Sequence, residues 1–442
     1  MHSNLIIRLI FLLLCGCSWL GRADLYDATL AYQDANYQRA FTQFNHLAKL
    51  GNADAMYNLG VMYLYGQGVE KSVASAFAWF SLAHDFGVTE ALQTAQLVLQ
   101  QAKQPKDLQD FVRQQRDNLA KTYLLDSTLP RLEKAETIPS PKKIADVLPN
   151  YPEEAVRQGV EGWVWLEFDI DSSGKAINIE VIDSYPKHTF TASLLNAVEK
   201  WRYSGAKTNH SLIYHFATYK GEQYHATLKL QKKDYEQQLM LNIDAAEKGV
   251  AQVQYNIANW LSMKDYNAYQ LLRYHWRTDN PSNRLLLAAA KNGFNLAQYR
   301  LAIQLLSRKE EELATLWLHH AAKTMNVARF RLATILLQNS HDEQAQIKAL
   351  DILEQAASEK HLRAIILLAT THLNITEDLE KAKYWVEQGL SLDTTHPQLL
   401  LLSAKLTSSK VQVNRLLSQA LKSAMDRGWS TAEIRAFSQL AQ

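Results

Sequence analysis

The sequence is poor in cysteine and in net charge, and each scarcity excludes a class of protein. Only two of its 442 residues are cysteines, Cys15 and Cys17, so the remainder of the chain has no disulfide and no thiol nucleophile. Lys plus Arg total 47 and Asp plus Glu 45, a near balance that offers no broad field for nucleic acid or an anionic membrane surface. No HExxH, GxSxG, phosphate-loop or dinucleotide motif occurs. We therefore expect a protein without enzymatic activity, cofactor or metal.

Long hydrophobic runs are also scarce, and the longest lies at the N-terminus. Arg8 stands within a short apolar segment, and small residues follow as far as Ala23, which is the pattern of a secretory signal. Residues 5–20 are shorter than the roughly 20 apolar residues of a membrane-spanning helix. Two cleavage sites compete: one after Ala23, which makes residues 1–23 the signal peptide, and one before Cys17 in a segment that resembles a lipoprotein box.

Residues 24–126 are predicted to be helical repeats. Apolar residues recur at helical spacing along the first part of this segment, at Tyr37, Ala40, Phe41, Phe44, Leu47 and Ala48. A helix with one apolar face needs a neighbour that covers it. The next stretch supplies small residues for close helix contact and a Gly66–Gly68 turn.

Residues 52–87 resemble the Sel-one-like repeat, a relative of the tetratricopeptide repeat. The resemblance rests on small residues, aromatic residues and the glycine turn, at Ala55, Leu59, Gly60, Tyr63, Gly66, Gly68, Ala76, Trp79, Phe80, Ala83 and Gly87. Ser72 stands where that family usually has Asp.

Proline is rare except in one place. Five of the nine prolines lie close together, at positions 130, 139, 141, 149 and 152. Because proline interrupts helices and the polar neighbours provide no core, we expect residues 127–148 to be a linker.

Residues 149–233 are predicted to form a small antiparallel sheet with one helix. From Trp163 to Ile170, the aliphatic and Phe side chains at even positions alternate with Trp and acidic side chains at odd positions. A period of two is typical of a strand with one buried face. Residues 171–174 make the turn into a partner strand, and a helix ends at Trp201, its largest apolar anchor. Residues 212–219 and 223–230 are predicted to form a second hairpin.

Helical repeats are expected to return over residues 234–442. Pairs of alanines begin at positions 245, 289, 321 and 356, which are 44, 32 and 35 residues apart. Each pair is followed by a larger apolar residue, at Tyr255, Tyr299, Phe330 and Ile365. A period in this range indicates a helical solenoid. The predicted fold is thus multidomain α+β, with α-solenoid arms of degenerate Sel-one-like or tetratricopeptide-like repeats on both sides of a βαβ domain.

The central domain resembles the C-terminal domain of the TonB energy-transducer family. The family's "YPxxA" start, "GxxG" turn, "DxxG" hairpin and "WRY" helix end occur here in order, at Tyr151, Pro152, Gly159, Gly162, Gly174, Trp201, Arg202 and Tyr203. Two departures are present: Ser204-Gly205 replaces Glu-Pro after "WRY", and the chain continues for some two hundred residues. A structural role for Tyr151 and Pro152 is favoured over direct peptide contact.

The resemblance implies a function in peptide docking. TonB-like domains hold a short segment of an outer-membrane receptor against the strand after the "WRY" helix, by strand addition. By that resemblance the docking strand comprises Leu212, Ile213, Tyr214, His215, Phe216, Ala217, Thr218 and Tyr219. We expect a periplasmic protein of a Gram-negative bacterium that binds envelope partners in transport across the envelope, the repeats acting as a scaffold.

Two alternatives remain open at this stage. The chain could be a purely structural Sel-repeat scaffold whose central sheet has no free edge. The family's motor partners, ExbB and ExbD, require an anchor, which residues 5–20 provide only if they stay uncut. Membrane association otherwise depends on lipidation at Cys17.

Two other patterns admit competing interpretations. Asp169, Asp171, Ser173, Gly174 and Glu180 match a calcium-loop spacing, but the flanking residues alternate as strands, so a hairpin turn is favoured. Trp163 and Trp165 could stack on a ligand, although packing against the linker or a repeat is the favoured interpretation.

Overall fold

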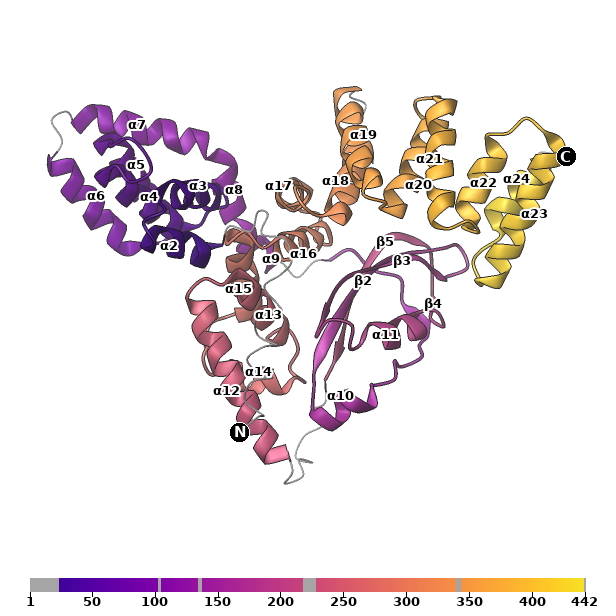
Figure 1. Cartoon of the computed structure of the whole chain (residues 1–442), viewed down its shortest axis with the longest axis horizontal. Coiled ribbons are helices and arrows are strands. Elements are labelled where there is room, and N and C mark those ends of the chain that lie inside the picture. Colours follow the sequence, from indigo (N-terminus) through magenta and orange to yellow (C-terminus); the bar gives the residue numbers. More distant parts are fainter. Residues whose placement is uncertain (1–23, 102–104, 134–136, 218–227, 339–342, 441–442) are drawn as a thin grey trace, which may run out of the picture. The chain divides into compact units, whose positions relative to one another are not determined.

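The computed structural model describes residues 24–101, 105–133, 137–217, 228–338 and 343–440 (Figure 1). Within these ranges the chain forms two compact units. The first comprises residues 24–123 with the short segments 247–252 and 291–294, and the second comprises residues 124–246, 253–290 and 295–440. The predicted signal peptide lies outside the described residues.

Helices make up the first unit. They are α2 (Leu25–Gln33), α3 (Tyr37–Ala48), α4 (Ala53–Tyr65), α5 (Val73–Asp85), α6 (Thr89–Gln101) and α7 (Pro105–Asn118), and α8 (Ala120–Asp126) follows across the unit boundary. Asn36, Asn52 and Ser72 precede three of these helices, and each side chain accepts a hydrogen bond from the backbone N–H three residues later. Such N-caps explain where α3, α4 and α5 begin.

The predicted pair of closely packed helices is confirmed as α4 and α5. A Cβ atom at Gly60 would lie 2.8 Å from the Phe80 ring, so only glycine permits this approach. Gly66 and Gly68 have φ angles of +71° and +68° in the turn between the helices, a conformation that favours glycine. Ser72, the departure from the Sel-one-like pattern, still caps α5 through Oγ, 3.1 Å from the N of Ser75.

The sheet domain opens the second unit. Its elements are α9 (Thr128–Leu132), β1 (Lys143–Ala145), α10 (Glu153–Gln158), β2 (Gly162–Ile170), β3 (Ala176–Tyr185), α11 (Thr191–Val198), β4 (Arg202–Tyr203) and β5 (Lys207–Phe216). β2 is central in an antiparallel sheet of order β3-β2-β5, and β1 pairs with β4. Leu194 and Val198 of α11 pack against Val164, Leu166 and Phe168 of β2.

Paired helices complete the second unit, as the alanine pairs predict, although residues 247, 251–252 and 291 at their ends belong to the first unit. They are α12 (Leu228–Glu247), α13 (Ala251–Trp260), α14 (Asn267–Leu272), α15 (Pro281–Lys291), α16 (Asn295–Leu306), α17 (Glu311–Ala321), α18 (Asn326–Gln338), α19 (Glu343–Ser358), α20 (Leu362–Asn374), α21 (Leu379–Leu392), α22 (Pro397–Lys405), α23 (Lys410–Asp426) and α24 (Ala432–Leu440). The predicted multidomain α+β fold, with helices before and after a small sheet along the chain, is confirmed.

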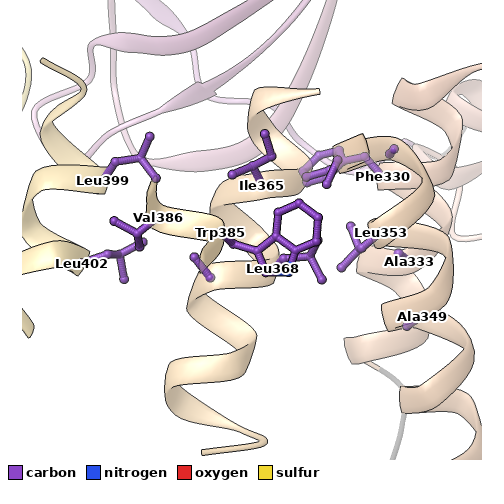
Figure 2. Packing of buried hydrophobic residues seen from close by; sticks show 14 residues of the cluster. Phe330, Ala333, Ala349, Leu353, Ile365, Leu368, Trp385, Val386, Leu399 and Leu402 are labelled. Atoms are coloured by element: carbon purple, nitrogen blue, oxygen red, sulfur yellow. The ribbon is translucent and has the colours of Figure 1, made fainter. Parts of the chain in front are cut away.

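The core of the last repeats is built from contacts between successive helix pairs. Figure 2 shows Phe330 and Ala333 of α18, Leu353 of α19, Leu368 of α20 and Trp385 of α21 within one apolar cluster. Each helix thus buries its apolar face against the next, which is how a solenoid is stabilised.

Two expectations about local structure differ from the observed fold. Residues 127–148, expected to be a linker, contain α9 and β1. α9 is held in place because Thr128 is buried and its Oγ1 accepts a 2.8 Å hydrogen bond from Trp317. The prediction of a second hairpin over residues 212–219 and 223–230 was wrong at residues 228–230, which begin helix α12. Residues 218–227 lie outside the described part of the chain.

Candidate peptide-docking edge

The first motif residues shape the entry to the sheet. Tyr151 Oη donates a 2.6 Å hydrogen bond to the carbonyl oxygen of Val160, and the Tyr151 ring contacts Phe190 and Phe216 edge-on. Pro152 precedes α10, and Gly159 ends that helix with a φ of +62°. These contacts hold Tyr151 within the domain core, and a role in peptide contact stays a prediction.

Gly162 and Gly174 occupy positions where a larger side chain has no room. A Cβ atom at Gly162 would lie 1.8 Å from the carbonyl oxygen of Tyr185. At Gly174 the φ is +81° and a Cβ would lie 2.2 Å from the Tyr203 carbonyl oxygen. Both glycines thus permit close approach of neighbouring backbone segments.

The "WRY" residues anchor the segment that leads into β5. Trp201 is fully buried, its Nε1 donates a 2.8 Å hydrogen bond to the carbonyl oxygen of Val147, and Lys143 Nζ lies 3.8 Å from its ring centre. The backbone N–H of Tyr203 donates to the Gly174 carbonyl oxygen at 2.9 Å. These contacts fix where β5 begins.

The second face of the sheet is covered by the C-terminal repeats, so the expectation of one buried face for β2 was wrong. Trp163 lies edge-on to Tyr255 of α13, and Trp165 stacks on Tyr299 of α16 with 5.4 Å between ring centres. Both tryptophans are 1% exposed or less. The favoured interpretation, that these tryptophans pack against a repeat, is confirmed.

Buried polar groups accompany the tryptophans at this interface. Glu167 is fully buried and accepts a 2.8 Å hydrogen bond from Tyr299 Oη, while its other oxygen has no partner among the described residues. Burial raises the pKa of Glu167. Asp183 accepts hydrogen bonds from Trp163 Nε1 at 3.2 Å and Tyr255 Oη at 3.1 Å.

β5 is the last strand on its side of the sheet within the described residues, and it carries most of the predicted docking residues. Leu212, Tyr214 and Phe216 pack towards the domain core. Ile213 and His215 pair with Trp165 and Trp163 of β2 and lie on the opposite face, towards the repeats. The remaining predicted residues are Ala217, directly after the strand, and Thr218 and Tyr219, which lie outside the described residues.

The start of β5 is already engaged by the protein itself. Asn209 has a φ of +56°, its N–H donates to Asp169 Oδ1 at 2.8 Å, and its carbonyl oxygen accepts from Arg331 Nη2 at 3.1 Å. Lys207 Nζ donates to Ser140 Oγ at 2.9 Å. Within the described chain, no further strand pairs with β5 on its outer side, and the carbonyl oxygen of Phe216 at its end accepts a 3.4 Å hydrogen bond from Tyr151 Oη.

A cavity of about 610 Å³ flanks β5 on the side of the repeats. Its walls come from β5, from α16 and α18, and from Ile138 and Ser140 of the preceding segment. This volume lies in the range of ligand pockets. His210 and His215 line it, and burial lowers the pKa of each to about 4, so both imidazoles are neutral at pH 7.

The opposite edge of the sheet, β3, is bound to the last repeats. Glu180 lies 3.1 Å from His361 Nε2, and Asn178 Oδ1 lies 3.1 Å from His396 Nε2. Arg363 of α20 donates to Asp169 at 2.8 Å. Strands flank the turn, and Asp169 and Glu180 contact residues of the repeats. The hairpin interpretation of residues 169–180 is therefore confirmed over the calcium loop.

His396 makes the stability of the second unit depend on pH. It is 2% exposed, and burial lowers its pKa to about 4 against an ordinary 6.5, with Asp393 opposing and Arg427 adding to the shift. Its contribution to stability is complete above pH 6.5 and is lost as the pH falls towards 4. In His396→Gln we expect the decline over this window to be shallower by about 1 kcal/mol per pH unit.

Urea unfolding at pH 7, 6, 5 and 4 measures this slope. His188→Gln, at an exposed histidine, controls for the substitution itself. Equal slopes in wild type and His396→Gln would contradict the assignment.

Comparison with known families agrees with this geometry. Residues 147–217 match the model of the Gram-negative bacterial TonB protein C-terminal, and residues 53–83 match the Sel1 repeat. The second unit therefore carries a TonB C-terminal-type domain and the first a Sel1 repeat, and both resemblances predicted from the sequence are confirmed.

Curated relatives match a short part of the chain. Protein TonB of Yersinia enterocolitica is 34% identical over 67 residues, which are 15% of this chain and 26% of that protein. Protein TonB of Salmonella typhimurium is 31% identical over 80 residues, 18% of this chain and 33% of that protein. The chain thus spans about a quarter to a third of the length of these relatives.

Two solved structures resemble the chain over most of its length. One is a protective antigen of uropathogenic Escherichia coli with an SLR fold, at 15% identity and a TM-score of 0.35, covering 95% of this chain and 80% of its own. The other is a Sel1 repeat protein from Oxalobacter formigenes, at 13% identity and a TM-score of 0.29, covering 84% of this chain and 100% of its own. In the described part of this protein, no helix has both the length and the hydrophobicity to cross a bilayer.

The sequence did not predict which residues of the repeats contact the sheet or line the cavity. These are Tyr255, Tyr299, Arg300, Arg331, His361 and Arg363. A signal existed, because Tyr255 and Tyr299 hold equivalent positions after successive alanine pairs, and equivalent positions of a solenoid lie along one surface.

Proposed function

We propose that this chain is a non-enzymatic periplasmic adaptor of a Gram-negative bacterium that binds an extended segment of an envelope partner by strand addition to β5. The observation that carries the proposal is the position of β5: it is terminal in the described sheet, follows the "WRY" motif and borders a cavity. The match to the TonB C-terminal family supports the proposal.

The energetics of strand addition set the size of the bound segment. In an antiparallel pair, alternate residues direct both their N–H and C=O towards the neighbouring strand. Residues 212–216 would form roughly four to six hydrogen bonds with the added strand, about half donated and half accepted, each contributing about 0.5–1.5 kcal/mol net. Because binding also orders the peptide, side-chain contacts in the adjoining cavity must add to the affinity.

The repeats support this edge by holding the sheet rigidly. α11 covers one face of β2, and Tyr255 and Tyr299 cover the other. Since Asp169, Glu180 and Asp183 also bond to repeat residues, the domain is fixed to its scaffold. A preorganised edge pays less ordering cost when a segment binds.

In this proposal the partners are envelope proteins of the outer-membrane receptor type, and the process is transport across the envelope. Direct coupling to an ExbB/ExbD-type motor would need a membrane anchor, either the uncut residues 5–20 or a lipid at Cys17. Sequencing of the mature N-terminus distinguishes these arrangements from cleavage after Ala23.

Hydrogen exchange on the full chain tests the docking proposal. With receptor-box peptides added, we expect slower amide exchange at residues 212–216, because an added strand protects the outward N–H groups. The β3 residues 178–181 serve as an internal reference that should not change.

A purely structural scaffold is the competing function. It is favoured by the contacts that occupy the start of β5, namely Arg331 with Asn209 and Ser140 with Lys207. No change at residues 212–216 at millimolar peptide would support the scaffold and exclude docking.

A further inference from the structure

The wall of the cavity opposite β5 carries two arginines that do not belong to the TonB-type domain. Arg300 lies on α16 and Arg331 on α18, and both line the cavity. Arg300 is only 6% exposed and its Nε has no hydrogen-bond partner among the described residues. Arg300 Nη1 donates to Asn259 Oδ1 and Arg331 Nη2 to the Asn209 carbonyl oxygen, so both bind neutral acceptors, although Arg331 also acts electrostatically on the buried Glu167.

The lining as a whole has an excess of positive charge. Lys207, Arg300 and Arg331 carry three positive charges against one negative charge on Glu311, which leaves +2. The lining histidines add nothing at pH 7, because burial lowers their pKa to about 4. Burial also lowers the pKa of Arg300, and Tyr255, Tyr266 and Asp183 oppose this shift only in part.

The lining also holds buried hydrogen-bonding atoms without partners. Besides Arg300 Nε, Gln304 Oε1 has no partner within the described residues. Unpaired buried polar groups are costly, and in native structures they often mark the place of a ligand or ion.

Strand geometry relates this charge to the incoming segment. Side chains of a strand added to β5 would alternate between the core side and the repeat side. Those on the repeat side would lie beside Ile213 and His215 and enter the cavity, where Arg300 and Arg331 form the far wall.

We propose that the cavity selects acidic segments: among extended peptides that add to β5, it prefers those with a carboxylate side chain on the repeat-facing side. This inference rests on the proposed docking function. It assigns selectivity to residues of the C-terminal repeats, whereas the TonB-type domain supplies the backbone edge.

Peptide binding to the full chain tests the inference. The probes are fluorescein-labelled nonapeptides of a Thr/Val host sequence, with Glu or its neutral isostere Gln at each successive position. We expect Glu to bind about tenfold more tightly than Gln at alternate positions only, since one charge-assisted hydrogen bond contributes about this much.

Variants identify the residues responsible. In Arg331→Gln we expect the Glu-over-Gln ratio to fall below about threefold, and Lys207→Gln, on the other wall, should also reduce it. Arg329→Gln is the matched control, because Arg329 lies on the same helix but pairs with Glu359 outside the cavity. The ratio is taken within each variant, so it does not depend on the fraction of folded protein.

Each outcome is decisive. Loss of the ratio in Arg331→Gln but not in Arg329→Gln supports acidic selection. Equal binding of Glu and Gln peptides to the wild type overturns it and leaves docking intact. Absence of binding by every peptide overturns the docking function and this inference together.

Discussion

Replacing Trp165 with alanine is expected to lower the free energy of unfolding of the second unit by about 3–5 kcal/mol, the usual cost of truncating a buried tryptophan. The side chain is 1% exposed, stacks on Tyr299 and donates a 2.8 Å hydrogen bond from Nε1 to Ser211. Its removal leaves a cavity between β2 and α16, where sheet and repeats meet. Urea unfolding followed by circular dichroism at pH 7 measures the change.

Two further variants separate packing from other causes. Tyr274→Ala truncates an aromatic side chain that is 60% exposed in the same unit, and we expect a change within about 0.5 kcal/mol. Tyr299→Phe keeps the stacked ring but removes the hydrogen bond to Glu167, at an expected cost of about 1–3 kcal/mol. A Trp165→Ala effect as small as that of Tyr274→Ala would show that the repeats do not cover the sheet in solution.

Gly162→Ala is expected to cost about 3 kcal/mol, at the upper end of the range for overpacking. The added Cβ would lie 1.8 Å from the Tyr185 carbonyl oxygen and 3.0 Å from the Phe190 ring. Because the nearest atom belongs to the backbone, β2 and β3 must separate locally to accept the methyl group. The measurement is again urea unfolding.

Gly205→Ala provides the matched control for this substitution. It lies in the same domain, and a Cβ there meets no atom within 4 Å. We expect a neutral or slightly stabilising effect, since alanine reduces the entropy of the unfolded chain. Similar losses in both variants would contradict the close approach of β2 and β3.

The sequence predicts the elements well where local pattern determines them. Alternation from Trp163 to Ile170 and the turn at Gly174 predict β2 and β3, and the alanine pairs predict the helix pairs of the second unit. In the first unit, the spacing of Gly60, Gly66 and Gly68 predicts the close contact of α4 with α5. In each case a short stretch of chain carries the whole signal.

The surroundings of the sheet could not be predicted in the same way. Alternation in β2 indicates which residues share a face, but it does not say whether Trp163, Trp165 and Glu167 meet solvent or another part of the chain. That depends on Tyr255 and Tyr299, which are some 90–130 residues away in sequence. The cavity likewise combines β5 with Arg300 and Arg331, and no local pattern relates these segments.

The most direct test of strand addition to β5 is a scan of the bound peptide with N-methyl groups. Methylation removes one backbone N–H at a time, and only every second N–H of an antiparallel strand faces its partner. We therefore predict that affinity for the full chain falls at alternate positions of the peptide and is little changed between them. Losses without this period of two, or no losses at all, would contradict the account.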